Sequence, residues 1–283
     1  MNTSLIKKIF FLIPLKARVK IYFFYRHRYW LSLSNPKTFS EKINFRKFNY
    51  LPSYSDLADK FKVRDYVAEK IGSEYLIPLV YVSSAKDFIE FPNLSKNSKY
   101  VAKTNHGSGP EHIEFLPSTK SNLELFNKFK YALDNDFDGV NFAESHYSSI
   151  PRKILIEKRL GESKVPEDFK FHIFENNGDP IWFLQVDEGR FEKHIRNFYD
   201  SNFNFIYLEV LHPNGKYILP SHDLISQMAH LGIKLVKGLK YARVDFYLVE
   251  EKIYFGEITL TPGSGFERFS DTNFDKLFGK YWR

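Results

Sequence analysis

Cysteine is absent from this sequence of 283 residues. Its absence excludes a disulfide framework and any thiolate metal site, and nothing in the chain requires an oxidising compartment. Long hydrophobic runs are also missing. The longest run near the N-terminus, residues 9–15, has seven residues and contains Pro14. Because crossing a bilayer takes about 20 apolar residues, the sequence predicts no transmembrane helix.

Several catalytic signatures are missing as well. No GKS or GKT follows the glycine-rich segment at residues 107–109, which excludes a Walker A loop. The nine histidines form no HxxxH pair and have no triad-like neighbours. Aromatic residues, by contrast, are abundant, with 29 Phe and 18 Tyr. The chain can therefore bury a substantial core, as one large domain or two lobes.

Positive charge is concentrated at the N-terminus. The first 50 residues contain eleven Lys or Arg and one acidic residue, Glu41, a balance of +10. Since the whole chain carries +7, the other 233 residues sum to −3. Residues 1–34 also interleave apolar groups with these cations, which favours a helix lying on an anionic membrane face. A basic-faced helix packed on its own domain is the alternative, and both interpretations stay open.

Hydrophobic periodicity predicts a mixed set of elements. The motif Thr38-Phe39-Ser40-Glu41 indicates a capping box that opens a helix. Helices and strands alternate without a regular βαβ rhythm, which favours an α+β protein with antiparallel sheets. Helices are expected at 56–71, 122–135 and 222–237, and strands at 76–82, 99–103, 112–116, 153–158, 169–174, 180–186, 241–249 and 253–260.

The last two strands bring two carboxylates together. If residues 250–252 form a three-residue hairpin loop, Asp245 lies opposite Glu257 and Arg243 opposite Thr259, all on one face. Two carboxylates at that spacing repel each other unless a cation lies between them, and oxygen ligands suit Mg²⁺. A solvated hairpin face explains the same residues, so the hairpin alone leaves both interpretations open.

Two further segments carry residues suited to phosphate. Lys103 ends a strand and is followed by His-Gly-Ser-Gly at 106–109, where an ammonium group and backbone N–H groups can approach an anion. Lys60 and Arg64, four residues apart, are expected to share a face of the helix at 56–71. Glu157 follows the apolar strand residues 154–156.

Taken in order, these segments resemble the TupA-like ATP-grasp family, which is linked to teichuronopeptide and other cell-surface polysaccharide biosynthesis. The resemblance runs from about Asn35 to the C-terminus. It is carried by NPKTFSEKI, LADKFKVRDYV, AKTNHGSG, ILIEKRL, NFYD, ARVDFYLV and IYFGEITLTPGSGF. It implies an ATP-grasp fold, in which two α+β lobes with antiparallel sheets hold ATP between them. The corresponding division is a basic N-terminal arm at 1–55, a small lobe at 56–155 and a large lobe at 156–283.

The same resemblance implies roles for individual residues. One departure is Thr259, which stands where ATP-grasp enzymes usually have Asn. The implied ATP contacts are Lys60 and Lys103 on the phosphates, His106, Gly107, Ser108 and Gly109 in the mobile loop, Glu157, Lys158 and Leu160 at the adenine, and Asp168 at the ribose. The implied Mg²⁺ ligands are Asp245, Glu257 and Thr259, and the implied catalytic groups are Arg243 and the backbone of Ser264 and Gly265. Cations expected at an acidic acceptor are Arg190, Lys193, His194 and Arg196.

The implied activity is ATP-dependent ligation of a carboxylate to an amine through an acyl phosphate, with ATP and Mg²⁺ as cofactors. The expected partners are an acidic sugar of a cell-surface polysaccharide and an amine or amino acid. We expect a cytoplasmic protein with peripheral membrane contact through residues 1–34 and no nucleic-acid partner. Two alternatives are a glycosyltransferase-like enzyme of the same pathway, and a membrane- or nucleic-acid-binding module with a degenerate nucleotide fold. The first lacks a DxD motif at a strand end, and the second lacks a basic stripe outside the arm.

Overall fold

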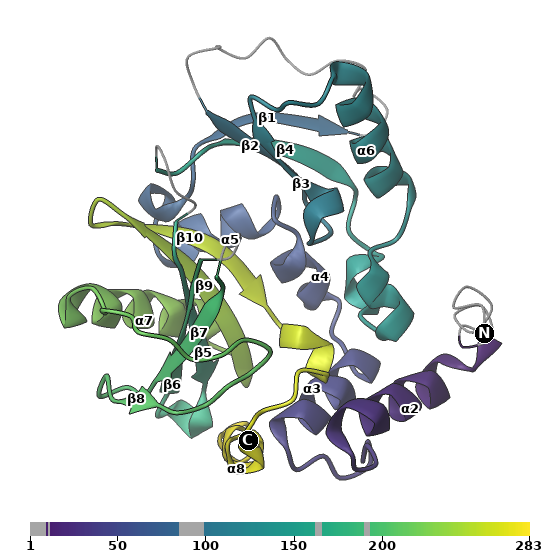
Figure 1. Ribbon diagram of the computed structural model, residues 1–283, viewed down its shortest axis with the longest axis vertical. Helices are drawn as coiled ribbons and strands as arrows, with labels where there is room; N and C mark the ends of the chain where they lie inside the picture. Colours follow the sequence, from purple (N-terminus) through teal and green to yellow (C-terminus); the bar gives the residue numbers. More distant parts are fainter. Residues whose placement is uncertain (1–9, 11, 85–98, 162–165, 190–192) are drawn as a thin grey trace.

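Two antiparallel sheets organise the chain in the computed structural model, which describes residues 10, 12–84, 99–161, 166–189 and 193–283 (Figure 1). The small sheet has the strand order β1-β4-β2-β3 and the large sheet the order β10-β9-β5-β6-β7-β8. The α+β class is therefore confirmed. The strands are β1 (Leu79–Ser84), β2 (Tyr100–Thr104), β3 (Ile113–Leu116), β4 (Lys153–Lys158), β5 (Asp168–Phe174), β6 (Ile181–Glu188), β7 (Ile195–Tyr199), β8 (Phe205–Ile206), β9 (Tyr241–Val249) and β10 (Lys252–Thr259).

Helices cover these sheets on their apolar faces. α6 packs on the small sheet and α7 on the large sheet, each through one buried stripe (Figure 1). The N-terminal helices and the C-terminal helix lie together at one end of the large sheet (Figure 1). The helices are α2 (Leu15–His27), α3 (Phe39–Phe48), α4 (Ser53–Ala58), α5 (Val63–Lys70), α6 (Asn122–Asp134), α7 (His222–Val236) and α8 (Thr272–Tyr281).

The expected helix at 56–71 is wrong as a single element, because the chain breaks at residues 59–62 between α4 and α5. Asp59 has an extended backbone, and its Oδ1 accepts hydrogen bonds from Phe61 N and from Asn105 Nδ2. A side chain that satisfies backbone donors in this way competes with helical hydrogen bonding. Lys60 therefore lies in the break, whereas Arg64 is the second residue of α5.

The large sheet separates an apolar face from a polar one. Side chains at alternate positions of its central strands, such as Phe171 and Val244, pack against α7 in one core cluster. Lys170, Asp245 and Glu257 have the opposite parity on β5, β9 and β10 and line a pocket instead. All seven residues of β5 are buried, because both faces of this strand are covered. The polar face of the sheet thus points its charged side chains into the pocket. Alternation in the sequence predicts which residues share that face, but not that the face is buried.

The β9–β10 hairpin has a shorter turn than predicted. Val249 pairs with Lys252, so the loop has two residues, Glu250 and Glu251, both with positive φ (51° and 62°). A β-bulge at Gly256 then shifts the register by one residue. The two differences cancel, so the predicted opposition of Asp245 to Glu257 and of Arg243 to Thr259 is correct.

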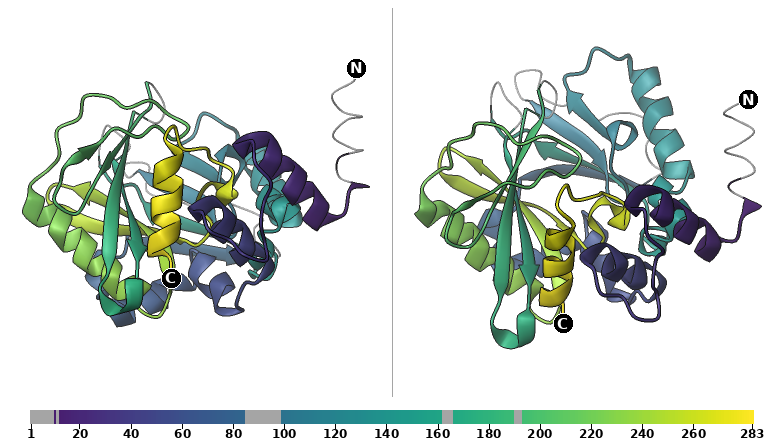
Figure 2. Two further views of the ribbon diagram at one scale, coloured as in Figure 1. Left: turned by 90° about the horizontal axis from the view of Figure 1, so that it is seen from below. Right: turned by 60° about the horizontal axis from the view of Figure 1, so that its bottom comes forward.

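The N-terminal helix packs against the rest of the protein. Val19 and Phe23 of α2 are fully buried in a cluster that also contains Phe266. α2 lies at the periphery of the molecule in both views of Figure 2. No helix within the described ranges combines the length and apolarity needed to cross a bilayer. Through these packing contacts, residues 15–48 lie against the large sheet and the loop that follows β10.

The predicted capping box at the start of α3 is confirmed. Thr38 Oγ1 accepts from Glu41 N, and Glu41 Oε2 accepts from Thr38 N. Thr38→Ala is expected to lower the free energy of unfolding by about 1 kcal/mol, because the backbone N–H of Glu41 loses its acceptor. Urea denaturation of the variant measures this loss. Thr38→Ser keeps the hydroxyl and serves as the control, and equal losses in both variants would contradict the capping role.

Candidate active site

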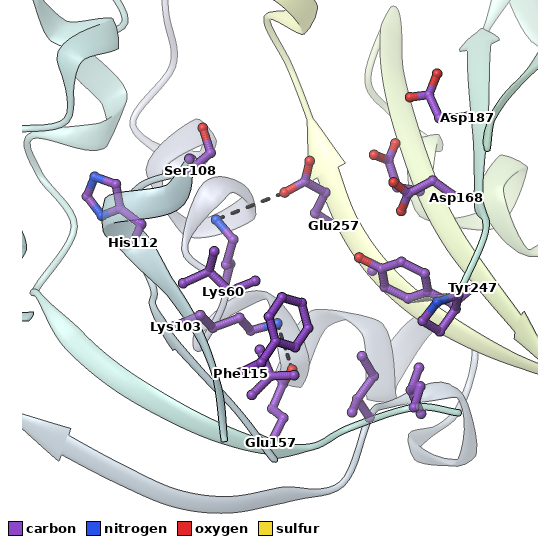
Figure 3. Close-up of a pocket in the computed structure, with 18 of the residues that line it drawn as sticks. Lys60, Lys103, Ser108, His112, Phe115, Glu157, Asp168, Asp187, Tyr247 and Glu257 are labelled. Atoms are coloured by element: carbon purple, nitrogen blue, oxygen red, sulfur yellow. Dashed lines mark ion pairs between the residues drawn. The ribbon is translucent and has the colours of Figure 1, made fainter. Parts of the chain in front are cut away.

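A single pocket of about 570 Å³ lies between the two sheets (Figure 3). Its walls come from β2, β3, β4 and the 107–113 loop on one side, and from β5, β6, β9 and β10 on the other. Most of the residues predicted from the sequence line it. These are Lys60, Lys103, Gly107, Ser108, Gly109, Glu157, Lys158, Leu160, Asp168, His194, Arg196, Arg243, Asp245 and Glu257.

One end of the pocket is apolar and has the character of a base-binding cleft. Ile77, Val101 and Phe115 line it. Glu157 carries its carboxylate at the boundary of this region, where Oε2 lies 2.7 Å from Lys103 Nζ and Oε1 accepts from Arg64 Nη1 at 3.2 Å. The Glu157 carboxylate therefore holds two cations in place, and Figure 3 shows its ion pair with Lys103. The sequence analysis grouped Arg64 with Lys60, because the distance from Glu157 in the chain hid this contact.

A glycine-rich loop and two lysines form the middle of the pocket. Lys60 Nζ donates to Gly107 O at 2.8 Å and lies 4.0 Å from Glu257 Oε2, on the opposite wall (Figure 3). Burial lowers the pKa of Lys60 despite the neighbouring carboxylates. A Cβ on Gly107 would lie 2.3 Å from the ring of His112, so only glycine fits there. Ammonium groups beside exposed backbone N–H groups suit a polyphosphate.

His106 does not take part in this loop as predicted. Its side chain is buried away from the pocket, with Nε2 hydrogen-bonded to Ala132 O of α6. Burial lowers the pKa of His106 to about 4, which keeps the imidazole neutral. His112 lines the pocket instead, and its Nδ1 hydrogen-bonds Thr104 Oγ1 at 2.7 Å. The glycine-rich motif predicted a role for the adjacent His106, whereas the turn at 107–112 places His112 at the pocket.

Lys170 is the main site residue that sequence reasoning missed. Its Nζ donates to Asp245 Oδ2 at 2.8 Å and lies 3.2 Å from Asp168 Oδ2 and 4.0 Å from Asp187 Oδ2. Pairing of β5 with β9 puts Lys170 directly opposite Asp245. Its place two residues after Asp168, between Phe169 and Phe171, was the signal that the sequence offered. One lysine thus lies within 4.0 Å of three buried carboxylates.

Arg243 completes this charged cluster. Its Nε and Nη2 donate to the two oxygens of Asp245 at 2.7 and 2.8 Å, and Nη2 also approaches Glu257 Oε1 at 3.3 Å. Burial alone would raise the pKa of Asp245, but Arg243 and Lys170 hold it below its usual value. Lys60 and Arg243 likewise keep the pKa of Glu257 low, against the effects of burial and of Asp245. Both carboxylates are therefore ionised at neutral pH.

The donor set fits a hard divalent cation shared with a phosphate ligand. Among the residues that the structure describes, no three or more His, Asp or Glu side chains converge as a metal cage. Mg²⁺ in phosphate-transfer sites typically takes one or two carboxylates and completes its shell with phosphate and water. Glu257, whose side chain is 38% exposed, and Asp245 supply that number. Thr259 Oγ1 donates to Glu257 Oε1 at 3.2 Å and accepts from Arg243, which orients both side chains.

The cations predicted for an acidic acceptor are only partly brought together. Arg196 pairs with Asp187 through Nε and Nη2, at 2.6 and 3.2 Å, so its guanidinium is already engaged. Burial by itself would raise the pKa of Asp187, but the Arg196 guanidinium holds it below its usual value. His194 lines the pocket 3.6 Å from Asp187, whereas Lys193 is exposed and does not. Arg190 lies outside the described residues.

Side chains of the N-terminal helices hold the 261–265 loop, which follows β10. Lys47 Nζ donates to Ser264 O at 2.8 Å, and Asn44 Nδ2 donates to Gly265 O at 3.1 Å. Ser264 has a positive φ of 53°. Neither Ser264 nor Gly265 lines the pocket directly. The polar side chains of α3 therefore fix this loop behind the Arg243–Glu257 wall.

Two antiparallel sheets that face one pocket, with paired lysines on one wall and paired carboxylates on the other, define a nucleotide-binding enzyme of the ATP-grasp fold. The family model described as TupA-like ATPgrasp matches residues 41–283. The chain belongs to the TupA-like ATP-grasp family. Its family places it among the ATP-grasp ligases, ADP-forming enzymes that use ATP and Mg²⁺.

Solved structures agree with this fold. The chain is similar to D-alanine–D-alanine ligase from Helicobacter pylori, at 19% identity with a TM-score of 0.50, over 86% of this chain and 67% of that one. The match to D-alanine–D-alanine ligase from Bacillus anthracis has 14% identity and a TM-score of 0.42, over 74% of this chain and 58% of the other. The chain thus spans about three fifths to two thirds of their length. Comparison with curated protein sequences finds no match.

Proposed function

We propose that the protein is an ATP-dependent carboxylate–amine ligase that works through an acyl phosphate. The observation that carries this proposal is the order of groups along one pocket. An apolar cleft is followed by Lys103 and Lys60 with the glycine-rich loop, and then by Asp245, Glu257 and Arg243. That order matches adenine, then phosphates, then the transferring phosphoryl group. The proposed ribose contact is Asp168, and the proposed lobes are residues 56–155 and 156–283.

The proposed chemistry needs two steps. A substrate carboxylate oxygen attacks the γ-phosphorus of ATP, the bond to the bridging oxygen breaks, and ADP leaves. The amine then attacks the carbonyl carbon of the acyl phosphate, phosphate leaves, and the amine nitrogen loses a proton. Mg²⁺, when bound, neutralises phosphate charge. Arg243 and Lys170 stabilise the charge that develops beyond the γ-phosphate, and the pocket excludes water that would hydrolyse the acyl phosphate.

The acid and the amine are the finer part of the proposal. We infer that the acid is a uronic acid or related acidic sugar of a cell-surface polysaccharide, free or lipid-linked, and that the amine is an amino acid or small amine. The linkage of the family to envelope polysaccharides supports this acceptor, and His194, which lines the pocket beside Asp187, offers a polar group for it. Enzymes titled D-alanine–D-alanine ligase among the similar structures support an amino-acid partner. Such an acceptor implies a cytoplasmic protein at the inner face of the membrane.

ADP release tests the ligase proposal. Purified protein with ATP and Mg²⁺ is expected to release ADP in proportion to product only when a uronic acid and an amine are both present. Hydroxylamine can replace the amine, because it traps an acyl phosphate as a hydroxamate. Thermal shift with ATP–Mg²⁺ against a uridine diphosphate sugar provides the control. A larger shift with the nucleotide sugar, and no hydroxamate with any acid, would favour a glycosyltransferase-like enzyme instead.

A further inference from the structure

Helix α2 has two apolar faces, and within the described part of the chain only one of them is buried. Val19, Phe23 and His27 recur at intervals of four residues and are buried against the protein. On the opposite side, Ile21, Phe24 and Tyr25 are 43%, 38% and 60% exposed. A helix that only packs on its own domain is expected to be polar on its outer side. The outer side of α2 therefore lacks an internal explanation.

The exposed aromatic groups of α2 form one continuous surface. Trp30, which is 64% exposed, stacks on Phe24 with ring centroids 4.5 Å apart. The Arg28 guanidinium lies over the Tyr25 ring at 5.3 Å. We call Ile21, Phe24, Tyr25 and Trp30 the α2 patch. Aromatic side chains with a polar or cationic edge are characteristic of surfaces that enter the headgroup region of a bilayer.

Cations accompany this patch. Lys16 and Lys20 precede Phe24 by eight and four residues and so lie on the same side of the helix. Arg28 is the residue that ends the helix, and its guanidinium reaches the patch over Tyr25. No Asp or Glu occurs in residues 1–40. The first acidic residue, Glu41, is buried, and its carboxylate accepts from three backbone N–H groups, those of Ser32, Lys37 and Thr38. Residues 1–40 therefore contribute positive charge to this surface and no negative charge.

We propose that the α2 patch docks on an anionic membrane surface. Apolar side chains enter the headgroup boundary while Lys16, Lys20 and Arg28 contact lipid phosphates. A second copy of the chain is a poor occupant, because two such surfaces would bring like charges together. This inference does not depend on the ligase activity, since no residue of the α2 patch lines the pocket.

Docking through α2 would also orient the active site. On its inner side, His27 Nε2 hydrogen-bonds Gly265 O at 3.0 Å, and Arg26 Nε donates to Phe266 O at 3.1 Å. The helix thus connects the proposed membrane face to the loop behind Glu257. For the same reason, deletion of residues 1–34 is an unsuitable test, because it would remove the buried face as well. Substitutions confined to the exposed face avoid this problem.

Vesicle co-sedimentation of the full chain tests the proposal. Wild-type protein is expected to bind phosphatidylglycerol–phosphatidylcholine vesicles, with binding that falls at high salt, and not pure phosphatidylcholine vesicles. Phe24→Ser/Tyr25→Ser/Trp30→Ser should weaken the partition coefficient at least about tenfold. Lys16→Gln/Lys20→Gln/Arg28→Gln should weaken it about 100-fold. The control is Tyr131→Ser/Tyr207→Ser/Ile218→Ser, which removes three even more exposed apolar groups elsewhere and should bind as wild type does.

Folding and self-association are measured alongside. Each variant should keep the wild-type melting temperature and its shift with ATP–Mg²⁺. If the aromatic variant does not fold, vesicle binding by the Lys16→Gln/Lys20→Gln/Arg28→Gln variant tests the proposal. Vesicles should also shift Trp30 emission to shorter wavelength, a shift that Trp30→Phe removes. Equal binding by wild type and both α2 variants would overturn the proposal. So would a dimer, detected by light scattering, that the aromatic variant converts to monomer.

Discussion

Glutamine in place of Glu257 is expected to reduce ATP turnover by about 10³-fold or more. The substitution keeps the size of the side chain and its contact with Thr259, but removes the charge that a divalent cation needs. A metal ion contributes several kcal/mol to phosphoryl transfer, and about 4 kcal/mol corresponds to about 10³ in rate. ADP release in the presence of acid, amine and Mg²⁺ measures the effect.

The matched control lies on the same hairpin. Glu251→Gln removes a carboxylate from the exposed turn and should leave turnover unchanged. Both variants should unfold at the wild-type urea concentration, which separates loss of chemistry from loss of fold. Turnover of Glu257→Gln within about threefold of wild type would show that Glu257 is not a metal ligand.

Lys170→Met is expected to lower the free energy of unfolding by about 3–5 kcal/mol at neutral pH. Three carboxylates, those of Asp168, Asp187 and Asp245, lie within 4.0 Å of the Lys170 ammonium group, and all of them are buried. Removing one buried partner leaves charge without compensation. Urea denaturation measures the loss, and Lys252→Met, on the exposed end of β10, is the control expected to change stability little.

The loss should depend on pH in a defined direction. In the wild type the pKa values of Asp245 and Asp187 are below their unfolded values, so their stabilising contribution is present at neutral pH and is lost as pH falls through the folded pKa. Without Lys170 the carboxylates protonate more easily. The difference in stability between wild type and variant should therefore shrink from pH 7 toward pH 4. A difference that is constant over this range would show that Lys170 acts through packing and not through charge.

The hairpin shows how far sequence patterns reach and where they stop. Alternation correctly placed Arg243, Asp245, Glu257 and Thr259 on one face, and their pairing was also correct. The predicted loop length was wrong, and the bulge at Gly256 compensated for it. Bulges depend on the twist and packing of the whole sheet, so loop length alone could not have fixed the register.

The remaining differences have the same origin. Lys170 faces Asp245 only because β5 pairs with β9, although 75 residues separate them. Arg196 was predicted as a free cation, but β6–β7 pairing places it opposite Asp187. His106 was predicted in the phosphate loop, but α6 covers it. In each case the partner lies on another strand or helix, and the pattern within one element does not contain it.

The sequence by itself determined the antiparallel α+β class, the capping box of α3, most strand positions and the order of the ATP-grasp motifs, because these follow from local periodicity and from motif spacing. Only the tertiary structure decided which charges meet. Strand pairing gathered Lys170, Arg243 and the buried carboxylates into one network, and packing of α2 and α3 fixed the 261–265 loop. These contacts join segments far apart in the chain, and their energies depend on burial, which no local pattern specifies.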